Sequence, residues 1–490
     1  MFRTSIRPTR LVAASLALVF VVAGMLPATA ATRRTPHLRL VAGSSTATLY
    51  SSKSGRVQLD LGVYLASIEG PFRVDAWRPT YRDPIQTAQV ITMSDGSTVS
   101  VPLAAGLNDG WLGLRRFLRI TVTDDTGALL GKRVMGFCPN SYDQQRIDDT
   151  GPLNPTFPSF CSSNPFTRGM VWGIDQGWAV NTGGWNSPAM HLPEGTFHAT
   201  VRVRAPFVDA FDIAPADAAL RMDLHVVSGG GSCLPICPNQ ATNASGADPM
   251  PAVPTTMHPD PSTLPDLRTL PAYGISVRSR HGHDWVSFGA DVWDAGPGQL
   301  LVEGYRQSGD TVMQAEQYFL DPSGTVVGKA PVGTLEFDSR PGHEHWHFEQ
   351  FATYQLLDKT KMQVERSRKT GFCIAPTDAI DLRSPGAQWR PDITGLWSAC
   401  GTSSALWIRE SLPPGWGDTY VQSLPGQAFD VTNLPNGTYY IAVVANPLGA
   451  LYEVHQHNDV SYRKIFIGGS PGHRTVVVPP YQGIDSESGY

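Results

Sequence analysis

Three histidines spaced two residues apart, His343, His345 and His347, are the strongest candidates for chemistry in this chain of 490 residues. In a β-strand, residues i, i+2 and i+4 point to the same face, so the three imidazoles would converge on one side. Neutral imidazole is a ligand for copper, zinc, iron and nickel. Histidine makes up 13 of the 490 residues, so three within five positions are a strong concentration. The pattern predicts a metal site; the alternative is a polar strand face with three solvated histidines.

Further landmarks follow the histidines in a defined order. The stretch from His343 to Asp358 reads HEHWHFEQFATYQLLD, Lys369 stands four residues before Cys373, and Asp418-Thr419-Tyr420 lies beyond. This order resembles the lysyl oxidase family of copper amine oxidases, over about residues 264–468. Other segments that carry the resemblance are Leu264–Leu267, Leu434–Tyr439, Asn446-Pro447 and Glu453–Asp459.

The chain departs from the animal members of that family at two points. Those members have a further histidine three residues before the H-x-H-x-H pattern, where this chain has Arg340. They also have more cysteines in the catalytic domain, where this chain has only Cys373 and Cys400. The substrate choice of the animal enzymes is therefore not expected to carry over.

The resemblance implies a copper ion held by the three histidines and a quinone made from the enzyme's own side chains. Tyr420 would be oxidised near copper with O₂ and attacked by the Lys369 amine, giving lysine tyrosylquinone. The attack requires a neutral amine, and the like charges of Arg366 and Arg368 are expected to lower the pKa of Lys369. Asp418 is the candidate base for the substrate α-proton; the alternative is a turn-capping aspartate. The implied reaction converts primary amines to aldehydes and releases H₂O₂ and ammonia.

A second metal site is also implied by the resemblance, because animal relatives bind Ca²⁺ through an L-P-D-L segment and a later acidic cluster. The matching positions here are Asp266, the Leu267 carbonyl, Glu453, Asn458 and Asp459. Oxygen ligands of this kind suit Ca²⁺. A polar turn between strands is the alternative.

Two other functions compete with the amine oxidase. The chain could be a secreted metal-binding adhesion or structural module, in which Lys369 and Tyr420 never become joined. Three histidines with one water molecule could instead hold zinc for hydrolysis. The substrate is open between free amines and peptidyl lysine.

The N-terminus has the pattern of a secretory signal peptide. Arg3, Arg7 and Arg10 precede the apolar stretch 11–26, and an A-x-A cleavage pattern occupies 28–30. A membrane anchor is the alternative, although the apolar run is short for a membrane span. We expect a secreted protein with no stable membrane span after cleavage.

Six cysteines fit an exported protein with disulfides. Six cysteines allow 15 pairings, of which proximity favours Cys138–Cys161, Cys233–Cys237 and Cys373–Cys400. The resemblance implies the last pair as well. A zinc site at Cys233 and Cys237 is a weaker alternative.

The composition predicts an all-β fold. Gly (48) and Pro (40) are abundant, and short alternating runs such as 117–122, 197–203 and 285–292 are typical of half-buried strands. We expect an irregular N-terminal β-sandwich-like domain and a C-terminal lysyl-oxidase-like β-sandwich with long functional loops. The net charge of −5, without a basic domain, argues against a nucleic-acid partner.

The expected segments follow from these signals, with eight prolines between positions 235 and 265 marking a linker. They are a signal peptide (1–30), a β-rich domain of unknown role (31–232), a proline-rich linker (233–263), a catalytic domain (264–468) and a flexible tail (469–490).

Overall fold

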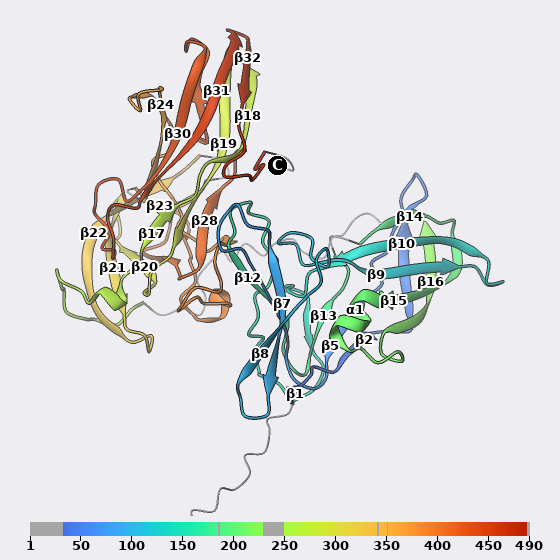
Figure 1. Cartoon of the computed structure of the whole chain (residues 1–490). Coiled ribbons are helices and arrows are strands. Elements are labelled where there is room, and N and C mark those ends of the chain that lie inside the picture. The colour runs from blue at the N-terminus through green and yellow to red at the C-terminus, as the bar shows by residue number, and fades with distance from the viewer. Residues whose placement is uncertain (1–32, 185–186, 229–248, 341–342, 350, 488–490) are drawn as a thin grey trace, which may run out of the picture.

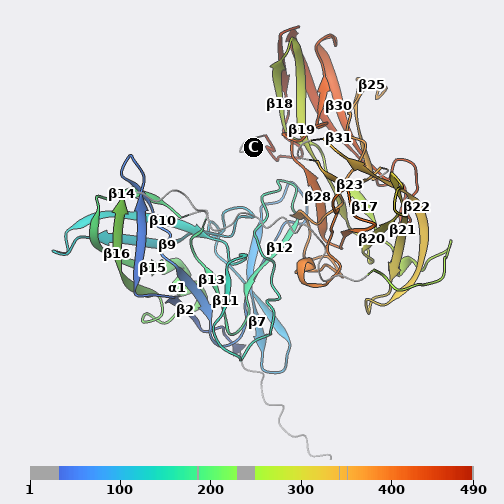
Figure 2. The same ribbon diagram turned by 180° about the vertical axis from the view of Figure 1, so that it is seen from behind.

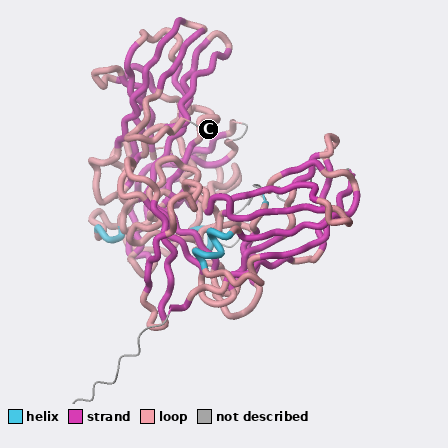
Figure 3. Tube along the Cα trace, turned by 45° about the vertical axis from the view of Figure 1, so that its right-hand side comes forward, coloured by secondary structure: helices cyan, strands magenta, loops and turns pink. Residues whose placement is uncertain are grey.

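The protein is almost entirely β-structure, as predicted from its sequence (Figure 3). The computed structural model describes residues 33–184, 187–228, 249–340, 343–349 and 351–487. The expected signal peptide and the expected Cys233–Cys237 disulfide lie outside these residues. Within them, the only α-helix is Ala205–Phe211 (α1), with short 3-10 turns at Pro261–Thr263 and Pro391–Ile393.

Residues 33–228 form one lobe, blue to green in Figure 1, whose described residues contain three sheets. The first consists of Arg33–Arg34 (β1), Phe72–Trp77 (β6), Gln86–Met93 (β7), Thr98–Pro102 (β8) and Gly169–Ile174 (β12), in the order β1-β7-β6-β12 with β8 beside β7. The second consists of Thr46–Ser51 (β3), Arg56–Gln58 (β4), Leu114–Thr123 (β9), Leu129–Phe137 (β10), Ala189–His191 (β14), Gly195–Val203 (β15) and Ala219–Ser228 (β16), in the order β10-β9-β15-β16-β3-β4-β14. The third consists of Leu38–Ala42 (β2), Val63–Ser67 (β5), Gln144–Arg146 (β11) and Trp178–Asn181 (β13), in the order β11-β13-β5-β2.

Residues 249–487 form the second lobe, yellow-green to red in Figure 1, again with three sheets among the described residues. One consists of Leu267–Thr269 (β17), Tyr273–Arg280 (β18), His283–Asp294 (β19), Asp378–Ala379 (β26), Trp416–Tyr420 (β28) and Ala428–Asp430 (β29), in the order β17-β19-β28-β26 with β18 and β29 also beside β19. Another consists of Leu300–Tyr305 (β20), Val312–Leu320 (β21), Val326–Asp338 (β22), His345–Phe348 (β23) and Trp407–Leu412 (β27), in the order β23-β22-β21-β20-β27. The last consists of Ala352–Leu357 (β24), Gln363–Arg366 (β25), Gly437–Ala445 (β30), Val460–Ser470 (β31) and His473–Val477 (β32), in the order β25-β24-β30-β31-β32.

Alternation of apolar and polar residues builds these strands. Along β15, Phe197, Ala199, Val201 and Val203 are buried, while the residues between them are more exposed. Strand β19 is buried along nearly its whole length, because it pairs with strands on both edges and is covered on both faces. Strands with alternating burial, such as β15, line one face of the core. Strands that are buried throughout, such as β19, cross its centre.

The two lobes lie against each other in both views of the ribbon (Figure 1, Figure 2), and buried side chains of both lobes pack together. The Thr167 hydroxyl donates to the Ala379 carbonyl at 3.0 Å, and the Arg168 amide donates to Ile380 at 2.7 Å. Phe160 packs edge-on against Trp416, with ring centroids 5.5 Å apart. One cluster of buried apolar residues continues from one lobe into the other.

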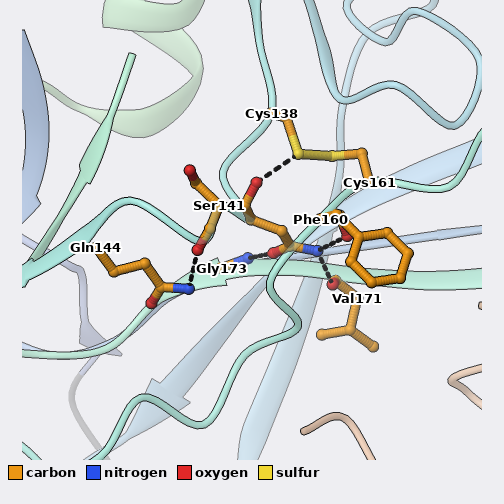
Figure 4. Close-up of a disulfide and its surroundings, with 8 residues drawn as sticks. Cys138, Ser141, Gln144, Phe160, Cys161, Val171 and Gly173 are labelled. Atoms are coloured by element: carbon orange, nitrogen blue, oxygen red, sulfur yellow. Dashed lines mark hydrogen bonds between the residues drawn. A yellow bond between two sulfur atoms is a disulfide. The ribbon is translucent and has the colours of Figure 1, made fainter. Parts of the chain in front are cut away.

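A disulfide between Cys138 and Cys161 supports this interface from the N-terminal side (Figure 4). Between the two cysteines, the Asn140 amide donates to the carbonyls of Phe160 (3.2 Å) and Val171 (2.9 Å). The side-chain oxygen Oδ1 of Asn140 also accepts from the Gly173 backbone amide at 3.0 Å. The loop that carries Phe160 is thereby fixed to strand β12.

The described part of the proline-rich segment, residues 249–263, lies on the second lobe. The Met250 amide donates to Glu303 at 3.1 Å, and the Thr256 amide donates to the Lys329 carbonyl at 2.9 Å. Prolines leave a chain few amide donors of its own, and these two are bonded to the neighbouring sheet.

The expected flexible tail after Gly468 is a wrong prediction for the described residues up to 487. Strand β31 continues to Ser470 and pairs with β32. Beyond β32, Tyr481 and Ile484 pack beside a buried cluster that includes Phe166 and Tyr273. A polar composition suggested mobility, but a few apolar side chains find partners that only the folded chain supplies.

Candidate metal centre and its neighbours

The three histidines gather at the end of a β-hairpin. His345 and His347 belong to β23, which pairs with the end of β22, whereas His343 sits in the turn before β23 rather than on the strand. The ring centroids of His345 and His347 are 4.5 Å apart, and that of His343 lies 5.6 Å from His347 and 6.1 Å from His345. Measured between possible ligand atoms, His343 and His347 lie within 4.8 Å of each other, which suits ligand bonds of about 2 Å to one ion, whereas His345 lies outside this group.

The ionisation of the three imidazoles suits a metal. Burial lowers the pKa values of His343 and His345, and burial together with the nearby Lys369 lowers that of His347 to about 3. All three rings are therefore neutral near pH 7, which is the form that binds metals. Both ring nitrogens of His343 are buried and lack a hydrogen-bond partner among the described residues. A metal ion is the kind of partner that would satisfy such a nitrogen.

A carboxylate that the sequence did not single out, Asp338, completes the cluster. Its Oδ2 atom lies 3.6 Å from His343 Nδ1 and 3.8 Å from His347 Nδ1. Asp338 is the last residue of β22 and stands opposite His345 in the hairpin. Hydrogen bonds from Arg340 lower the pKa of Asp338, so the carboxylate is charged. The cross-strand register would have identified Asp338, but the register is not readable from the sequence.

Trp346 anchors the opposite face of the histidine strand. Its indole donates to the Thr402 carbonyl at 2.9 Å, and the Arg306 guanidinium lies 4.8 Å from its ring centroid. The ring is 1% exposed and meets Phe337 edge-on. An indole held on several sides fixes the direction of the histidines on the other face.

Lys369 lies beside this cluster, in the loop after β25. Its Nζ atom is 4.4 Å from the ring centroid of Tyr420 and 5.1 Å from that of Phe372. The Ser367 hydroxyl accepts from the Lys369 amide at 3.0 Å and donates to the Gly426 carbonyl. A Cβ atom at Gly426, where φ is +86°, would lie 3.0 Å from the Lys369 amide nitrogen. The backbone around Lys369 is thus held against the loop that follows Tyr420.

The amine of Lys369 is poised to lose its proton. Lys369 is 4% exposed, and burial lowers its pKa to about 8. We expected Arg366 and Arg368 to be the cause, and this explanation is wrong. Burial dominates, and the cation that contributes is Arg340. A loop that folds into the interior removes water from the amine, which sequence neighbours cannot indicate.

Asp418 and Tyr420 stand two residues apart on β28 and are both buried. The Tyr420 hydroxyl donates to the Cys373 carbonyl at 3.2 Å, and burial raises its pKa well above the ordinary value. Burial also raises the pKa of Asp418, with a further contribution from Asp291. The Asp418 Oδ2 atom has no hydrogen-bond partner among the described residues. Such a carboxyl holds a proton more readily than an exposed one and can take part in proton transfer.

A disulfide joins the two segments that flank the histidine strand. Cys373 and Cys400 are bonded to each other, as proximity and the resemblance predict. Phe372 exchanges two backbone hydrogen bonds with Phe348, of 2.8 and 3.0 Å, while the Trp346 amide donates to the Cys400 carbonyl at 2.9 Å. The loop that carries Lys369 is therefore tied to β23 on one side and to the disulfide on the other.

The residues expected to bind Ca²⁺ also come together. Asn458 Nδ2 donates to Asp266 Oδ1 at 2.9 Å, and the Leu267 amide donates to Glu453 Oε2 at 3.1 Å. Asn458 Oδ1 and Asp459 Oδ1 are buried without a partner among the described residues. Burial raises the pKa of Glu453 to about 7. A hollow of about 740 Å³ opens beside this group and is lined in part by Glu453 and Asn458.

Comparison with known proteins places this site in a family. Residues 329–474 match the sequence model of the family described as lysyl oxidase. Residues 329–474 are therefore similar to the lysyl oxidase family, in agreement with the resemblance found in the sequence. Over 120 residues it is also 29% identical to protein-lysine 6-oxidase of Rattus norvegicus, which is 24% of this chain and 25% of that protein. The match thus spans about a quarter of the rat protein's length.

The matched lysyl oxidase domain contains the histidine cluster, Lys369, Asp418 and Tyr420. Asp266 and Leu267 lie before it, and so does the whole N-terminal lobe. Among the described residues, no helix has the length and apolar character needed to cross a membrane.

Proposed function

We propose that this protein is a secreted copper amine oxidase. It would convert a primary amine, O₂ and water into an aldehyde, ammonia and H₂O₂, using a cofactor formed from Lys369 and Tyr420. The family match supports amine oxidation as the class of activity. The observation that carries the finer proposal is the position of the Lys369 amine, 4.4 Å from the Tyr420 ring centroid and next to three neutral histidines.

In this proposal, His343, His345 and His347 hold the copper ion. Their burial keeps the imidazoles unprotonated, so no proton has to leave before the metal binds. When present, lysine tyrosylquinone supplies the electrophilic carbonyl that no ordinary side chain has.

Two further residues would take part directly in the chemistry, Lys369 as a nucleophile and Asp418 as a base. Lys369, with a pKa of about 8, has a substantial neutral fraction at mildly alkaline pH and can then act as a nucleophile. Asp418 lies on the same strand face as Tyr420, and its raised pKa suits a base that takes the α-proton of the substrate. The substrate class stays open between free amines and peptidyl lysine.

We also propose that Asp266, the Leu267 carbonyl, Glu453, Asn458 and Asp459 bind Ca²⁺. Two buried oxygens without partners, on Asn458 and Asp459, support the proposal, because Ca²⁺ prefers such ligands. The site would tie β17 to the loop between β30 and β31, outside the region of the amine chemistry.

The decisive experiment is mass spectrometry of copper-reconstituted protein, combined with peroxide detection during amine turnover. Wild-type protein should yield a peptide in which Lys369 and Tyr420 are joined. Lys369→Ala and Tyr420→Phe should each abolish the joined peptide and peroxide release. Asp418→Asn should keep the joined peptide while lowering kcat roughly 100-fold or more, the usual contribution of a general base.

Wild-type-like amine oxidation by Lys369→Ala or Tyr420→Phe would refute the mechanism. In that case, a metal-binding module would be the better account of the histidine cluster. Lys359→Ala is a matched control, because Lys359 is exposed in the turn before β25. This variant should retain both the joined peptide and turnover.

A further inference from the structure

We propose that Asp338 is a fourth protein ligand of the metal, through its carboxylate oxygen. This inference rests on the proposed copper site and adds a residue that lies outside the H-x-H-x-H pattern. Asp338 would bind the ion together with the three histidines, so the ligand set would carry one negative charge.

The hairpin register brings Asp338 to the face of the histidines. Asp338 pairs with His345, and Glu336 pairs with His347, so all four residues face the same side of the β22–β23 ladder. Phe337 and Trp346 occupy the other side. His343 lies between the two strands in the sequence, and its Nδ1 atom is 3.6 Å from Asp338 Oδ2.

The separations match ligands that share an ion. One donor atom each from Asp338, His343 and His347 lies within 4.8 Å of the others. Asp338 Oδ2 is 3.6 and 3.8 Å from the two Nδ1 atoms, which is too long for hydrogen bonds. Two ligand atoms that are each about 2 Å from one ion can be at most about 4 Å apart, so both separations fit a shared ion.

Arg340 positions the Asp338 carboxylate and leaves some of its lone pairs available to a metal. The Arg340 Nε atom donates to both oxygens of Asp338 at 2.9 Å, from an exposed side chain on the solvent side. An ionised carboxylate has about four lone-pair sites, so it can accept these bonds and still bind a metal. Arg340 occupies the place where animal members of the family have an additional histidine. In this chain, the additional metal ligand would therefore be the charged carboxylate of Asp338 and not a histidine at position 340.

Electrostatics also favour a carboxylate here. Imidazole ligands carry no charge and leave the full double charge on Cu²⁺, while the Arg340 guanidinium is bonded to Asp338 and the Lys369 amine lies over Tyr420 nearby. An anionic ligand reduces the repulsion between the ion and these cations. Glu336 does not serve this purpose, because its side chain is exposed.

The test compares Cu²⁺ binding and electron paramagnetic resonance spectra of wild-type protein, Asp338→Asn and Arg340→Gln. Asp338→Asn keeps the size of the side chain and removes the anionic ligand, so Cu²⁺ affinity should fall roughly tenfold or more. Its copper hyperfine splitting should differ from that of wild type. Arg340→Gln removes the guanidinium but retains the carboxylate, and its spectrum should stay like wild type. Glu344→Gln is the control, since Glu344 is an exposed carboxylate between two of the histidines.

An unchanged affinity and spectrum in Asp338→Asn would overturn the proposal. A weaker affinity with an unchanged spectrum would also overturn it, because Asp338 would then only orient the histidines. Circular dichroism of the metal-free variants checks that each is folded. Joined-peptide formation in wild type is measured separately. A protein that binds copper through Asp338 but never joins Lys369 to Tyr420 would refute the proposed function and leave this inference standing.

Discussion

At the scale of single residues, the most consequential feature is a buried amine against an aromatic ring. Lys369 is 4% exposed and sits over Tyr420, with no ion pair to a carboxylate among the described residues. Burial of a lysine stabilises its neutral form. The same desolvation that makes Lys369 costly to bury prepares it as a nucleophile.

The ionisation of Lys369 predicts how joining of the two side chains depends on pH. The neutral amine reacts, so the initial rate should rise with pH and level off above about 8, the pKa of Lys369. Tyr420 contributes no rise of its own in this range, because burial raises its pKa well above the ordinary value. Quenched samples of copper-loaded protein analysed by mass spectrometry at pH 6 to 10 would measure the rate. A rate that is flat or falls across this range would contradict the prediction.

At the scale of elements, strand β23 is held between two backbone partners that a disulfide joins. Phe372 bonds to Phe348 on β23, and the Cys400 carbonyl accepts from Trp346 on the same strand. The Cys373–Cys400 bond links these partners. The arrangement couples the loop that carries Lys369 to the strand that carries the histidines.

Removing this disulfide should therefore disturb the metal centre as well as stability. The double variant Cys373→Ser and Cys400→Ser should lose about 2–4 kcal/mol of unfolding free energy and bind copper more weakly. The matched control is Cys138→Ser with Cys161→Ser, a disulfide of similar sequence separation in the other lobe. It should lower stability with little effect on copper affinity. Denaturant unfolding and copper titration measure both effects, and equal losses of copper affinity in the two variants would argue against the coupling.

The proposed Ca²⁺ site also belongs to this scale, because it joins β17 to the loop after β30. Glu453→Gln removes a buried carboxylate whose pKa is raised to about 7, so Ca²⁺ affinity should fall at least about tenfold near pH 8. Gln456→Ala, at an exposed position of the same loop, is the control. Isothermal titration calorimetry measures the affinity. If wild-type protein shows no Ca²⁺ binding, the site is refuted.

At the scale of the whole molecule, the N-terminal lobe packs behind the strand that carries Asp418 and Tyr420. On the opposite face of β28, the Thr419 hydroxyl contacts both Asp291 and Asp378. Asn164 of the N-terminal lobe donates to Asp291 at 3.3 Å. Burial raises the pKa values of both aspartates, so the two carboxyls are expected to share protons rather than repel each other. The lobe thus supports strand β28 from outside the matched domain.

Loss of Asn164 should weaken this support. Asn164→Ala removes a donor to a buried carboxyl, which costs about 1–3 kcal/mol. Hydrogen exchange should become faster in β26 and β28, while the exposed Asn154→Ala control should leave exchange unchanged. Exchange measured by mass spectrometry on the full-length protein checks this expectation. Unchanged protection of both strands in Asn164→Ala would show that the lobe does not support the site.

The sequence by itself determined the features that depend on local pattern and chain order. Alternation with a period of two indicated the all-β fold, because a strand places successive side chains on opposite faces. The spacing of the histidines and the order of Lys369, Cys373 and Tyr420 identified the candidate site. Proximity along the chain predicted the Cys138–Cys161 and Cys373–Cys400 disulfides, and both are confirmed.

Only the tertiary structure decided what depends on burial and on pairing between distant segments. Asp338 joined the histidines through the register of a hairpin, and burial rather than neighbouring arginines lowered the pKa of Lys369. The ordered residues after Gly468 and the docking of Asn164 against Asp291 likewise required partners far along the chain. Desolvation and long-range contacts arise only when the chain folds, so no local pattern encodes them.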